Sequence, residues 1–195
     1  MRKDIVLCGV GGQGTVLASK LISDAAMAQG IPIMSAETIG MAQRGGSVFS
    51  HVRLGEGVYS PMIAEGEADL ILAFEPGEAV RCFPYLKEGG TVVVSNRAVM
   101  PVTAALSGSS YDGQEMIDYL RRHVENLVVV DTKAALEDLG SAKVLNLLLL
   151  GAALYSGTLG FSEEDMKAAI RARLPEKLHE LNFRALSYVG EKEKA

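Results

Sequence analysis

The sequence has few of the residues that build metal clusters and disulfide frameworks. Only two of its 195 residues are cysteines, Cys8 and Cys82, and only three are histidines. It contains no C-x-x-C pair and no H-E-x-x-H motif, so the ligand spacings of a cysteine-bound iron–sulfur cluster or a zinc site are missing. One cysteine falls in a predicted strand and the other in a predicted helix. We therefore expect no disulfide, no metal site and a reducing, cytoplasmic compartment.

Tryptophan, basic charge and long apolar runs are also scarce. Aromatic residues make up 6% of the chain and hydrophobic residues 48%, which predicts an aliphatic core. The net charge of −5 argues against a nucleic-acid partner, because such proteins usually present a basic surface. The longest apolar run, 147–155, is much shorter than the ~20 residues that span a bilayer. No signal peptide is recognisable at the N-terminus, so we expect no membrane partner.

What the sequence does have is a hydrophobic strand, 4–10, that runs into a dense glycine turn. Three glycines of this turn fit G-x-G-x-x-G, and an amphipathic helix follows. Such glycines permit a tight turn, close approach of a phosphate and close packing of helix on strand, while the helix N-terminus attracts anions. The turn could also serve packing alone. The candidate binding residues here are Gly9, Gly11, Gly12, Gln13, Gly14 and Thr15.

The hydrophobic pattern predicts an α/β fold with helices on both faces of a mostly parallel, mixed sheet. Buried strands alternate with helices through the middle of the chain, and the C-terminal third is helical. Alternating residues around a Gly-Glu-Gly turn predict an antiparallel hairpin near 47–63. We expect one domain over 1–195, with a frayed tail at 191–195. The further strands are predicted at 31–36, 69–74, 91–95 and 127–131, and helices at 78–86, 114–124, 142–156, from 162 and from 175.

Polar residues at loops and strand ends form a second group of candidates. Arg44, Gly45 and Gly46 could present a guanidinium fork to a phosphate or carboxylate, although a plain surface loop is equally compatible. Glu75 and Asn96 follow predicted strands at the edge where open α/β sheets bind ligands. Helix capping and turn formation are the structural alternatives for both residues.

Several nucleotide and acyl-transfer chemistries find little support. No Lys-Ser or Lys-Thr follows Gly14, which excludes a P-loop, and there is no G-x-S-x-G elbow. Glu37 follows Gly14 at about the 20-residue spacing of a ribose-binding acid, which keeps an NAD(P)- or flavin-binding oxidoreductase open. The hairpin predicted after Glu37, where a second crossover helix would belong, weakens that alternative. His51 is expected on the strand surface or in packing, and Cys8 in the core.

Taken together, the motifs resemble those of the gamma-type domain of 2-oxoacid:ferredoxin oxidoreductases, and most closely the beta-subunit group of the indolepyruvate enzymes. The matching segments are 9–14, 43–48 and 73–79, and Asn146 with 150–152 extends the match into the helical region. The resemblance implies a subunit that is inactive alone. The complex would oxidatively decarboxylate a 2-oxoacid on thiamine diphosphate, reduce ferredoxin through iron–sulfur clusters, and form an acyl-CoA.

The resemblance also implies how the work is divided between subunits. This chain has neither the cysteines for clusters nor a Gly-Asp-Gly…Asn thiamine diphosphate motif, so a larger partner would carry both cofactors and contact ferredoxin. No cofactor would bind tightly to this chain alone, and no catalytic residue is assigned to it. The glycine turn and Arg44 would receive the phosphates of coenzyme A or shape the partner's active-site entrance. A non-catalytic scaffold that docks a partner through the turn remains an alternative.

Overall fold

A six-stranded mixed sheet forms the centre of the molecule, in a computed structural model that describes residues 2–37, 46–100 and 110–192. The strand order is β2-β3-β1-β4-β5-β6. β1, β4, β5 and β6 are parallel, whereas β3 is antiparallel to both of its neighbours, β1 and β2. The strands are β1 (Lys3–Val10), β2 (Ile33–Glu37), β3 (Ser47–Leu54), β4 (Ala68–Ala73), β5 (Leu86–Ser95) and β6 (Asn126–Val130).

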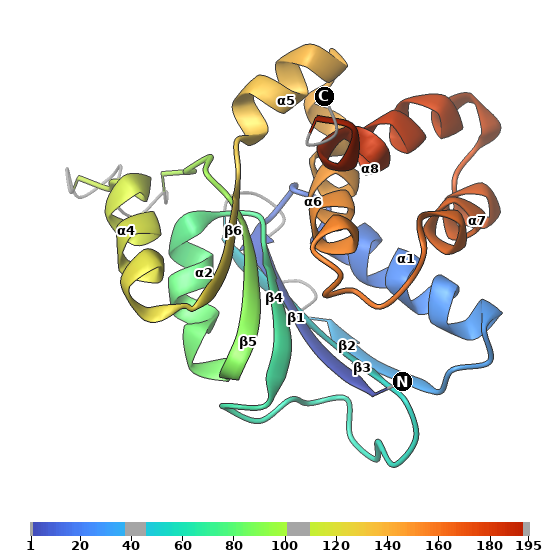
Figure 1. Ribbon diagram of the computed structural model, residues 1–195, viewed down its shortest axis with the longest axis horizontal. Coiled ribbons are helices and arrows are strands. Elements are labelled where there is room, and N and C mark those ends of the chain that lie inside the picture. The colour runs from blue at the N-terminus through green and yellow to red at the C-terminus, as the bar shows by residue number, and fades with distance from the viewer. Residues whose placement is uncertain (1, 38–45, 101–109, 193–195) are drawn as a thin grey trace.

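Helices cover both faces of this sheet, which confirms the predicted three-layer α/β fold (Figure 1). α2 and α4 lie on one face, and α1 with α5 to α8 on the other. Short 3-10 turns follow α2 and precede α6 and α8. The helices are α1 (Thr15–Ala28), α2 (Pro76–Cys82), α4 (Gly113–His123), α5 (Thr132–Leu139), α6 (Leu145–Tyr155), α7 (Glu163–Arg173) and α8 (His179–Lys192), and the 3-10 turns are Phe83–Tyr85, Ala142–Val144 and Glu176–Leu178.

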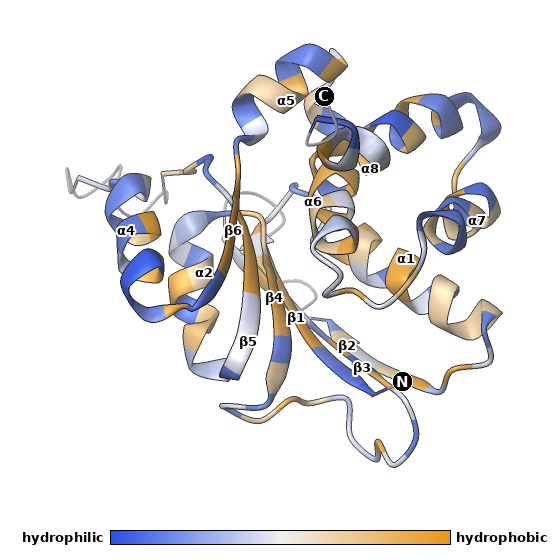
Figure 2. Cartoon of the chain, in the orientation of Figure 1, coloured by the Kyte–Doolittle hydropathy of each residue, from blue (hydrophilic) through white to orange (hydrophobic). Residues whose placement is uncertain are grey.

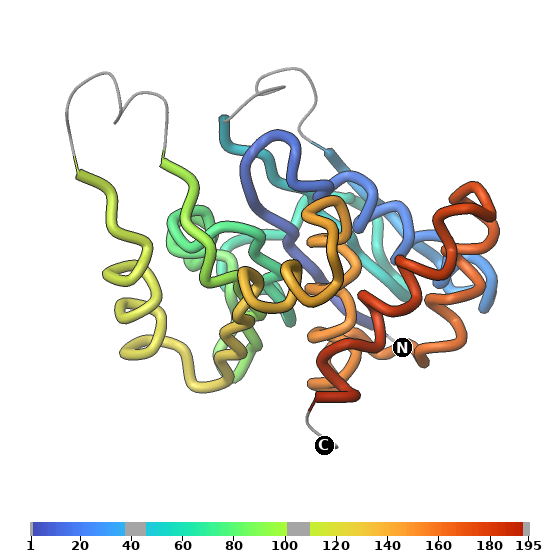
Figure 3. Tube along the Cα trace, turned by 90° about the horizontal axis from the view of Figure 1, so that it is seen from above, coloured from blue at the N-terminus to red at the C-terminus, as the bar shows by residue number. Residues whose placement is uncertain are grey.

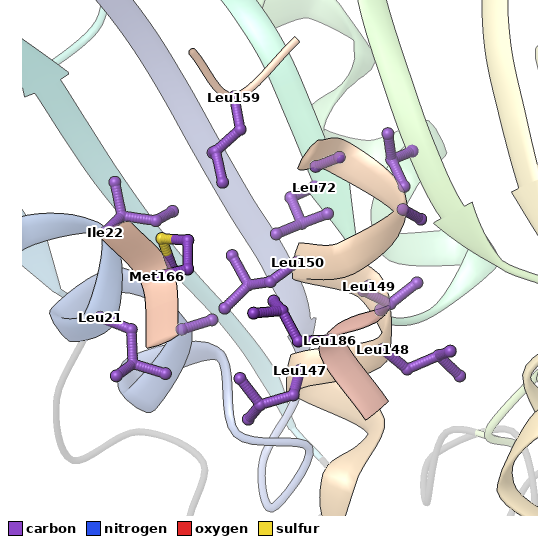
Figure 4. Close-up of a cluster of buried hydrophobic side chains, with 14 of the residues drawn as sticks. Leu21, Ile22, Leu72, Leu147, Leu148, Leu149, Leu150, Leu159, Met166 and Leu186 are labelled. Carbon is purple, nitrogen blue, oxygen red and sulfur yellow. The ribbon is translucent and has the colours of Figure 1, made fainter. Parts of the chain in front are cut away.

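The larger core is built around α6, which is apolar on all sides. Its leucines at 147–150 are all buried, between the sheet and the outer helices. Leu186 of α8 and Met166 of α7 reach the same cluster, as do side chains of α1 and β4 (Figure 4). Figure 2 shows the corresponding contrast, with a hydrophobic α6 and sheet and more hydrophilic outer helices. The predicted buried helix is therefore the element that joins the sheet to the C-terminal helices.

The predicted hairpin near 47–63 is correct in its first strand and wrong in its second. β3 is antiparallel as expected, but residues 58–63 form no strand. Both edges of β3 are already hydrogen-bonded, to β1 and to β2, so no edge is left for a returning strand. Pro61 also lacks an N–H for such a ladder. The segment is anchored instead by side chains of β3, because His51 Nδ1 accepts from Ile63 N at 3.2 Å.

Of the two alternatives given for His51, strand surface or packing, the structure shows packing, and its neighbour on the same face of β3 is buried as well. His51 is 1% exposed and Arg53 is 9% exposed. Arg53 Nε and Nη2 donate to the two carboxylate oxygens of Asp4 at 2.8 and 2.9 Å, and these bonds raise the pKa of Arg53. Burial lowers the pKa of His51. A charge deep in the fold is tolerated here because its partner sits on the neighbouring strand.

The start of α7 agrees with the sequence prediction, whereas the two ends of α8 do not. Helix α7 begins where the sequence predicts a helix, and Ser162 and Asp165 form a capping box at its start. The final helix begins later than expected, because Pro175 precedes a 3-10 turn rather than entering the first turn of α8. Helix α8 continues to Lys192, whose Nζ lies 3.2 Å from Asp138 Oδ2, so residues 191 and 192 are helical rather than frayed. Residues 193–195 lie outside the described part of the chain.

Candidate functional site

The glycine turn joins the end of β1 to the start of α1, and its glycines serve different purposes. Gly12 and Gly14 have φ angles of 98° and 87°, which belong to the left-handed region that favours glycine. A Cβ on Gly9 would lie 2.8 Å from Phe74 Cβ, at the end of β4, and 2.7 Å from Gln13 Oε1. Gly9 therefore permits close packing, while Gly12 and Gly14 permit the turn itself.

Gln13 holds the turn in place with both ends of its side-chain amide. Its Oε1 accepts from Val10 N at 2.8 Å, and its Nε2 donates to Phe74 O at 3.0 Å. The side chain therefore joins the carboxyl ends of two neighbouring parallel strands, β1 and β4. Gln13 positions the backbone of the turn, and its amide is occupied within the protein.

The N-terminus of α1 has the properties of an anion-binding site. Gly14 is the N-cap and provides no side-chain acceptor, and the first helical turn contains no acidic residue. The first backbone N–H groups of a helix have no partner inside the helix, and the helix dipole adds positive potential at that point. Because Gly12 has open space where a side chain would be, an anion can approach the main chain closely.

The second sequence motif meets this turn. Gly11 N donates to Gly46 O at 2.9 Å, which fixes the start of β3 beside the glycine turn. Arg44 and Gly45, the other two members of the Arg-Gly-Gly motif, lie outside the described residues. The described part thus brings the two motifs together through their backbones, although they are far apart in the sequence.

A third contributor comes from the helical third of the chain. Asn146, in the first turn of α6, is 3% exposed, and a Cβ on Gly14 would lie 3.0 Å from its Nδ2. Its Oδ1 accepts from Leu147 N at 3.0 Å. Asn146 therefore packs against the glycine turn. Sequence reasoning did not place it at the site, because a single asparagine in an apolar helix gives no indication of its neighbour.

Glu75 caps α2, and its carboxylate is fully used inside the protein. Oε2 accepts from Glu78 N at 3.0 Å, while Oε1 accepts from Val99 N at 3.3 Å and from the hydroxyl of Tyr111. Burial, together with the neighbouring Glu75, raises the pKa of Tyr111 well above its ordinary value. The capping alternative considered for Glu75 is confirmed by the bond from Glu78 N, and the other two bonds join α2 to residues that follow β5.

Asn96 links the ends of β5 and β6. Its Nδ2 donates to Asp131 Oδ1 at 3.1 Å, and its Oδ1 accepts from Thr132 N at 3.2 Å. The bond from Asn96 lowers the pKa of Asp131. Asn96 also lines a cavity of about 750 Å³ together with Arg97 and Lys133. These two cations were not named in the sequence analysis. Each follows the end of a predicted strand by two residues, and this position beside the carboxyl end of a strand could have identified them as candidates.

The topology disfavours the dinucleotide-binding alternative. In that fold the acid follows a strand directly beside the first one. Here Glu37 ends β2, and β3 lies between β2 and β1, so the two strands are separated by roughly 10 Å rather than 5 Å. Glu37 Oε1 accepts instead from Ser19 Oγ of α1 at 2.8 Å. The Glu37 carboxylate is therefore hydrogen-bonded to α1 instead of facing the glycine turn, where a ribose would lie.

The two cysteines are buried, as expected for core residues, and both are free thiols. Hydrogen bonding with Cys82 and burial raise the pKa of Cys8, which disfavours a nucleophilic role. Across residues 2–37, 46–100 and 110–192, the His, Cys, Asp and Glu side chains form no group of three suited to a metal ion. None of the helices described over these ranges has the length and apolar character needed to cross a membrane.

These features define an α/β protein with a glycine turn, an uncapped helix N-terminus and a second glycine motif at one edge of a mixed sheet. The chain belongs to the pyruvate ferredoxin/flavodoxin oxidoreductase family, which matches residues 4–191. The indolepyruvate oxidoreductase subunit IorB of Archaeoglobus fulgidus is 37% identical over 95% of this chain and 92% of its own length. The resemblance found in the sequence is confirmed, and the chain is a subunit-type member of a family of oxidoreductase complexes.

Two solved structures share the fold. The gamma subunit of a keto/oxoacid ferredoxin oxidoreductase from Geobacter sulfurreducens has a TM-score of 0.66 and 25% identity, with 97% of each chain covered. A 2-oxoglutarate:ferredoxin oxidoreductase from Magnetococcus marinus, solved with 2-oxoglutarate, coenzyme A and succinyl-CoA bound, has a TM-score of 0.68 and 18% identity. The match covers 99% of this chain and 31% of that one, so the same fold is there one part of a longer polypeptide.

Proposed function

We propose that this chain is the small subunit of an indolepyruvate or related aryl-pyruvate ferredoxin oxidoreductase and that it contributes to coenzyme A binding. The 37% identity with an indolepyruvate oxidoreductase subunit supports this substrate class. With two buried cysteines, the chain leaves the iron–sulfur clusters and thiamine diphosphate to a larger partner subunit. That partner also passes the electrons to ferredoxin, and this chain supplies no catalytic residue.

The observation that carries the proposal is the uncapped start of α1 beside the second glycine motif. The backbone donors at the start of the helix and the dipole of α1 bind a phosphate of coenzyme A, and Gly12 gives it room to approach. Gly11 N donates to Gly46 O, and Arg44 precedes Gly46 by two residues in the sequence, so its guanidinium is the side chain proposed as a further phosphate ligand. The Magnetococcus marinus structure, which contains coenzyme A, supports this ligand class.

Binding the phosphates gives this chain an orienting role in the reaction. With its nucleotide end held at the turn, coenzyme A directs its pantetheine thiol toward the acyl group on the partner subunit. The thiol becomes the thioester sulfur of the acyl-CoA product, and the chain itself moves no proton or electron. Its contribution is the lower entropic cost of bringing the thiol to the acyl group.

The test is calorimetry of coenzyme A binding to the assembled complex, comparing wild type with Arg44→Ala. Loss of a charged hydrogen bond to phosphate is expected to weaken binding by about tenfold or more. Arg122→Ala provides the matched control, because Arg122 is exposed on α4. If Arg44→Ala leaves the affinity unchanged, the phosphate role of Arg44 is rejected, and the partner-docking scaffold becomes the better account of the turn.

A further inference from the structure

The start of α2 carries two buried carboxylates that the proposed function does not use. Glu75 and Glu78 are 3% and 7% exposed, and both belong to 73–79, one of the segments that carry the resemblance to the family. A carboxylate removed from water costs stability unless its oxygens are bonded. The partners of these two acids therefore indicate what the segment contributes.

Glu75 fixes the start of α2 to two other parts of the chain. Its carboxylate accepts from Glu78 N within the helix, from Val99 N after β5, and from the Tyr111 hydroxyl before α4. The Tyr111 oxygen also accepts from Gly77 N at 2.9 Å, and a Cβ on Gly77 would lie 2.8 Å from that oxygen. These bonds hold the first turn of α2 in place, so Glu78 has a fixed support.

Glu78 reaches from this support to the start of β3. Its Oε2 accepts from Ser47 Oγ at 2.5 Å, and the same oxygen lies 3.4 Å from Nε of Arg81, whose side chain is 68% exposed. Ser47 is the first residue of β3 and follows Gly46, whose carbonyl oxygen accepts from Gly11 N at 2.9 Å. A series of two hydrogen bonds therefore joins α2, the start of β3 and the glycine turn.

The bond to Glu78 is made where the pairing of β1 with β3 ends. Ser47 lies opposite Val10, the last residue of β1, and the Gly11–Gly46 bond extends the contact one residue into the turn. In Figure 3 the turn after β1 and the start of β3 are seen side by side. The end of a ladder opens more easily than its middle, because further pairs hold it on one side only. The Ser47–Glu78 bond supplies a hold on the other side.

We propose that Glu78 is a positioning residue for the glycine turn: through Ser47 it holds Gly46 against Gly11, and so keeps the turn in the conformation that receives an anion. The role is one of geometry rather than charge, because a negative charge at Glu78 by itself opposes an anion at the turn. The inference rests on the proposed function in taking a phosphate of coenzyme A as that anion. Geometry and charge have opposite effects on binding, so substitutions at Glu78 separate them.

The first measurement is amide hydrogen exchange at Gly11, followed by NMR in the full-length chain without ligand. Ser47→Ala and Glu78→Ala should each speed this exchange by about tenfold, because each frees the segment that carries the acceptor of Gly11 N. Ser162→Ala is the matched control, since it removes a serine hydrogen bond of similar size at the start of α7. It should leave exchange at Gly11 as in wild type.

The second measurement is KM for coenzyme A and for the 2-oxoacid in the assembled complex. Ser47→Ala and Glu78→Ala should raise KM for coenzyme A by about tenfold and leave kcat and the KM for the 2-oxoacid unchanged. Glu78→Gln keeps an oxygen acceptor for Ser47, so it should return KM for coenzyme A to within about threefold of wild type. Arg81→Ala, which removes only the exposed ion pair of Glu78, should change none of these values.

Failure of this inference and failure of the proposed function give different results. If exchange at Gly11 responds no more to Ser47→Ala than to Ser162→Ala, the positioning role of Glu78 is overturned. The same holds if Glu78→Ala lowers KM for coenzyme A, because the carboxylate then acts through its charge. If exchange at Gly11 rises while KM for coenzyme A stays constant, Glu78 positions the turn, and coenzyme A binding at the turn is rejected instead.

Discussion

The side chain of Gln13 has a structural role in the candidate site that its position in a binding motif does not reveal. In the sequence it lies between glycines that could all touch a phosphate. In the fold its amide bonds the main chain of β1 and β4, at Val10 N and Phe74 O. Gly9 must lack a side chain because Gln13 and Phe74 occupy that space. Gln13 thus fixes the conformation of the turn whose glycines could contact a ligand.

Gln13→Ala is expected to destabilise the protein by about 1–3 kcal/mol, because Val10 N is buried and would be left without its acceptor. Urea denaturation of the isolated chain measures this change. Gln114→Ala, which removes an exposed side-chain amide that donates to Asp118, should stay within about 0.5 kcal/mol. Equal stability of the Gln13 variant and wild type would contradict a structural role and return Gln13 to the ligand contacts.

At the scale of helices, the crossing of α6 and α8 determines how the C-terminal third attaches to the sheet. Gly151 of α6 faces the backbone of α8, and a Cβ built there would lie 2.0 Å from Leu186 O. The two helices can approach this closely only because the position has no side chain. The same contact fixes α6, whose first turn brings Asn146 to Gly14 at the site.

Gly151→Ala is therefore expected to destabilise the protein by about 1–3 kcal/mol or more, because backbone cannot move aside as a side chain can. The change is measured as the shift in the urea midpoint. Gly190→Ala on α8 is the matched control, since its added Cβ would meet the ring of Tyr155 at 3.0 Å, and that residue is 45% exposed and can shift. A Gly151 variant no less stable than the Gly190 variant would show that the helices separate without cost.

For the whole molecule, the strand order disfavours a dinucleotide as the ligand of the glycine motif. Insertion of β3 between β1 and β2 moves Glu37 one strand farther from the turn than in a dinucleotide-binding fold. The same insertion places Gly46, at the start of β3, against Gly11. One feature of the topology thus moves Glu37 away from the turn and brings Gly46, the last residue of the Arg-Gly-Gly motif, to it.

The isolated chain is accordingly expected to bind NAD⁺ and NADP⁺ only weakly, with Kd above about 1 mM. Isothermal titration with each dinucleotide tests this, and a Glu37→Gln variant serves as the control for any residual ribose contact. Binding in the micromolar range that Glu37→Gln abolishes would show that the acid reaches the ribose after all, and would restore the dinucleotide-binding alternative.

Local signals in the sequence predicted much of the fold and part of the site. The alternation of strands and helices depends on patterns within short segments, and it appears as expected. The returning strand at 58–63 was wrong because strand pairing depends on which edges are free. Arg97 and Lys133 were missed because only the tertiary structure shows that they line the same cavity beside β5, β6 and α5.

By itself, the sequence determined that strands and helices alternate, that a glycine turn opens the first helix, and that the chain has no C-x-x-C pair. These follow from periodicity, backbone freedom and residue chemistry, which are properties of short segments. Only the tertiary structure decided that β3 separates β1 from β2, that Gly11 meets Gly46, and that Asn146 packs against Gly14. Such contacts join residues distant in the chain, and they are fixed by the packing of the whole core rather than by any local preference.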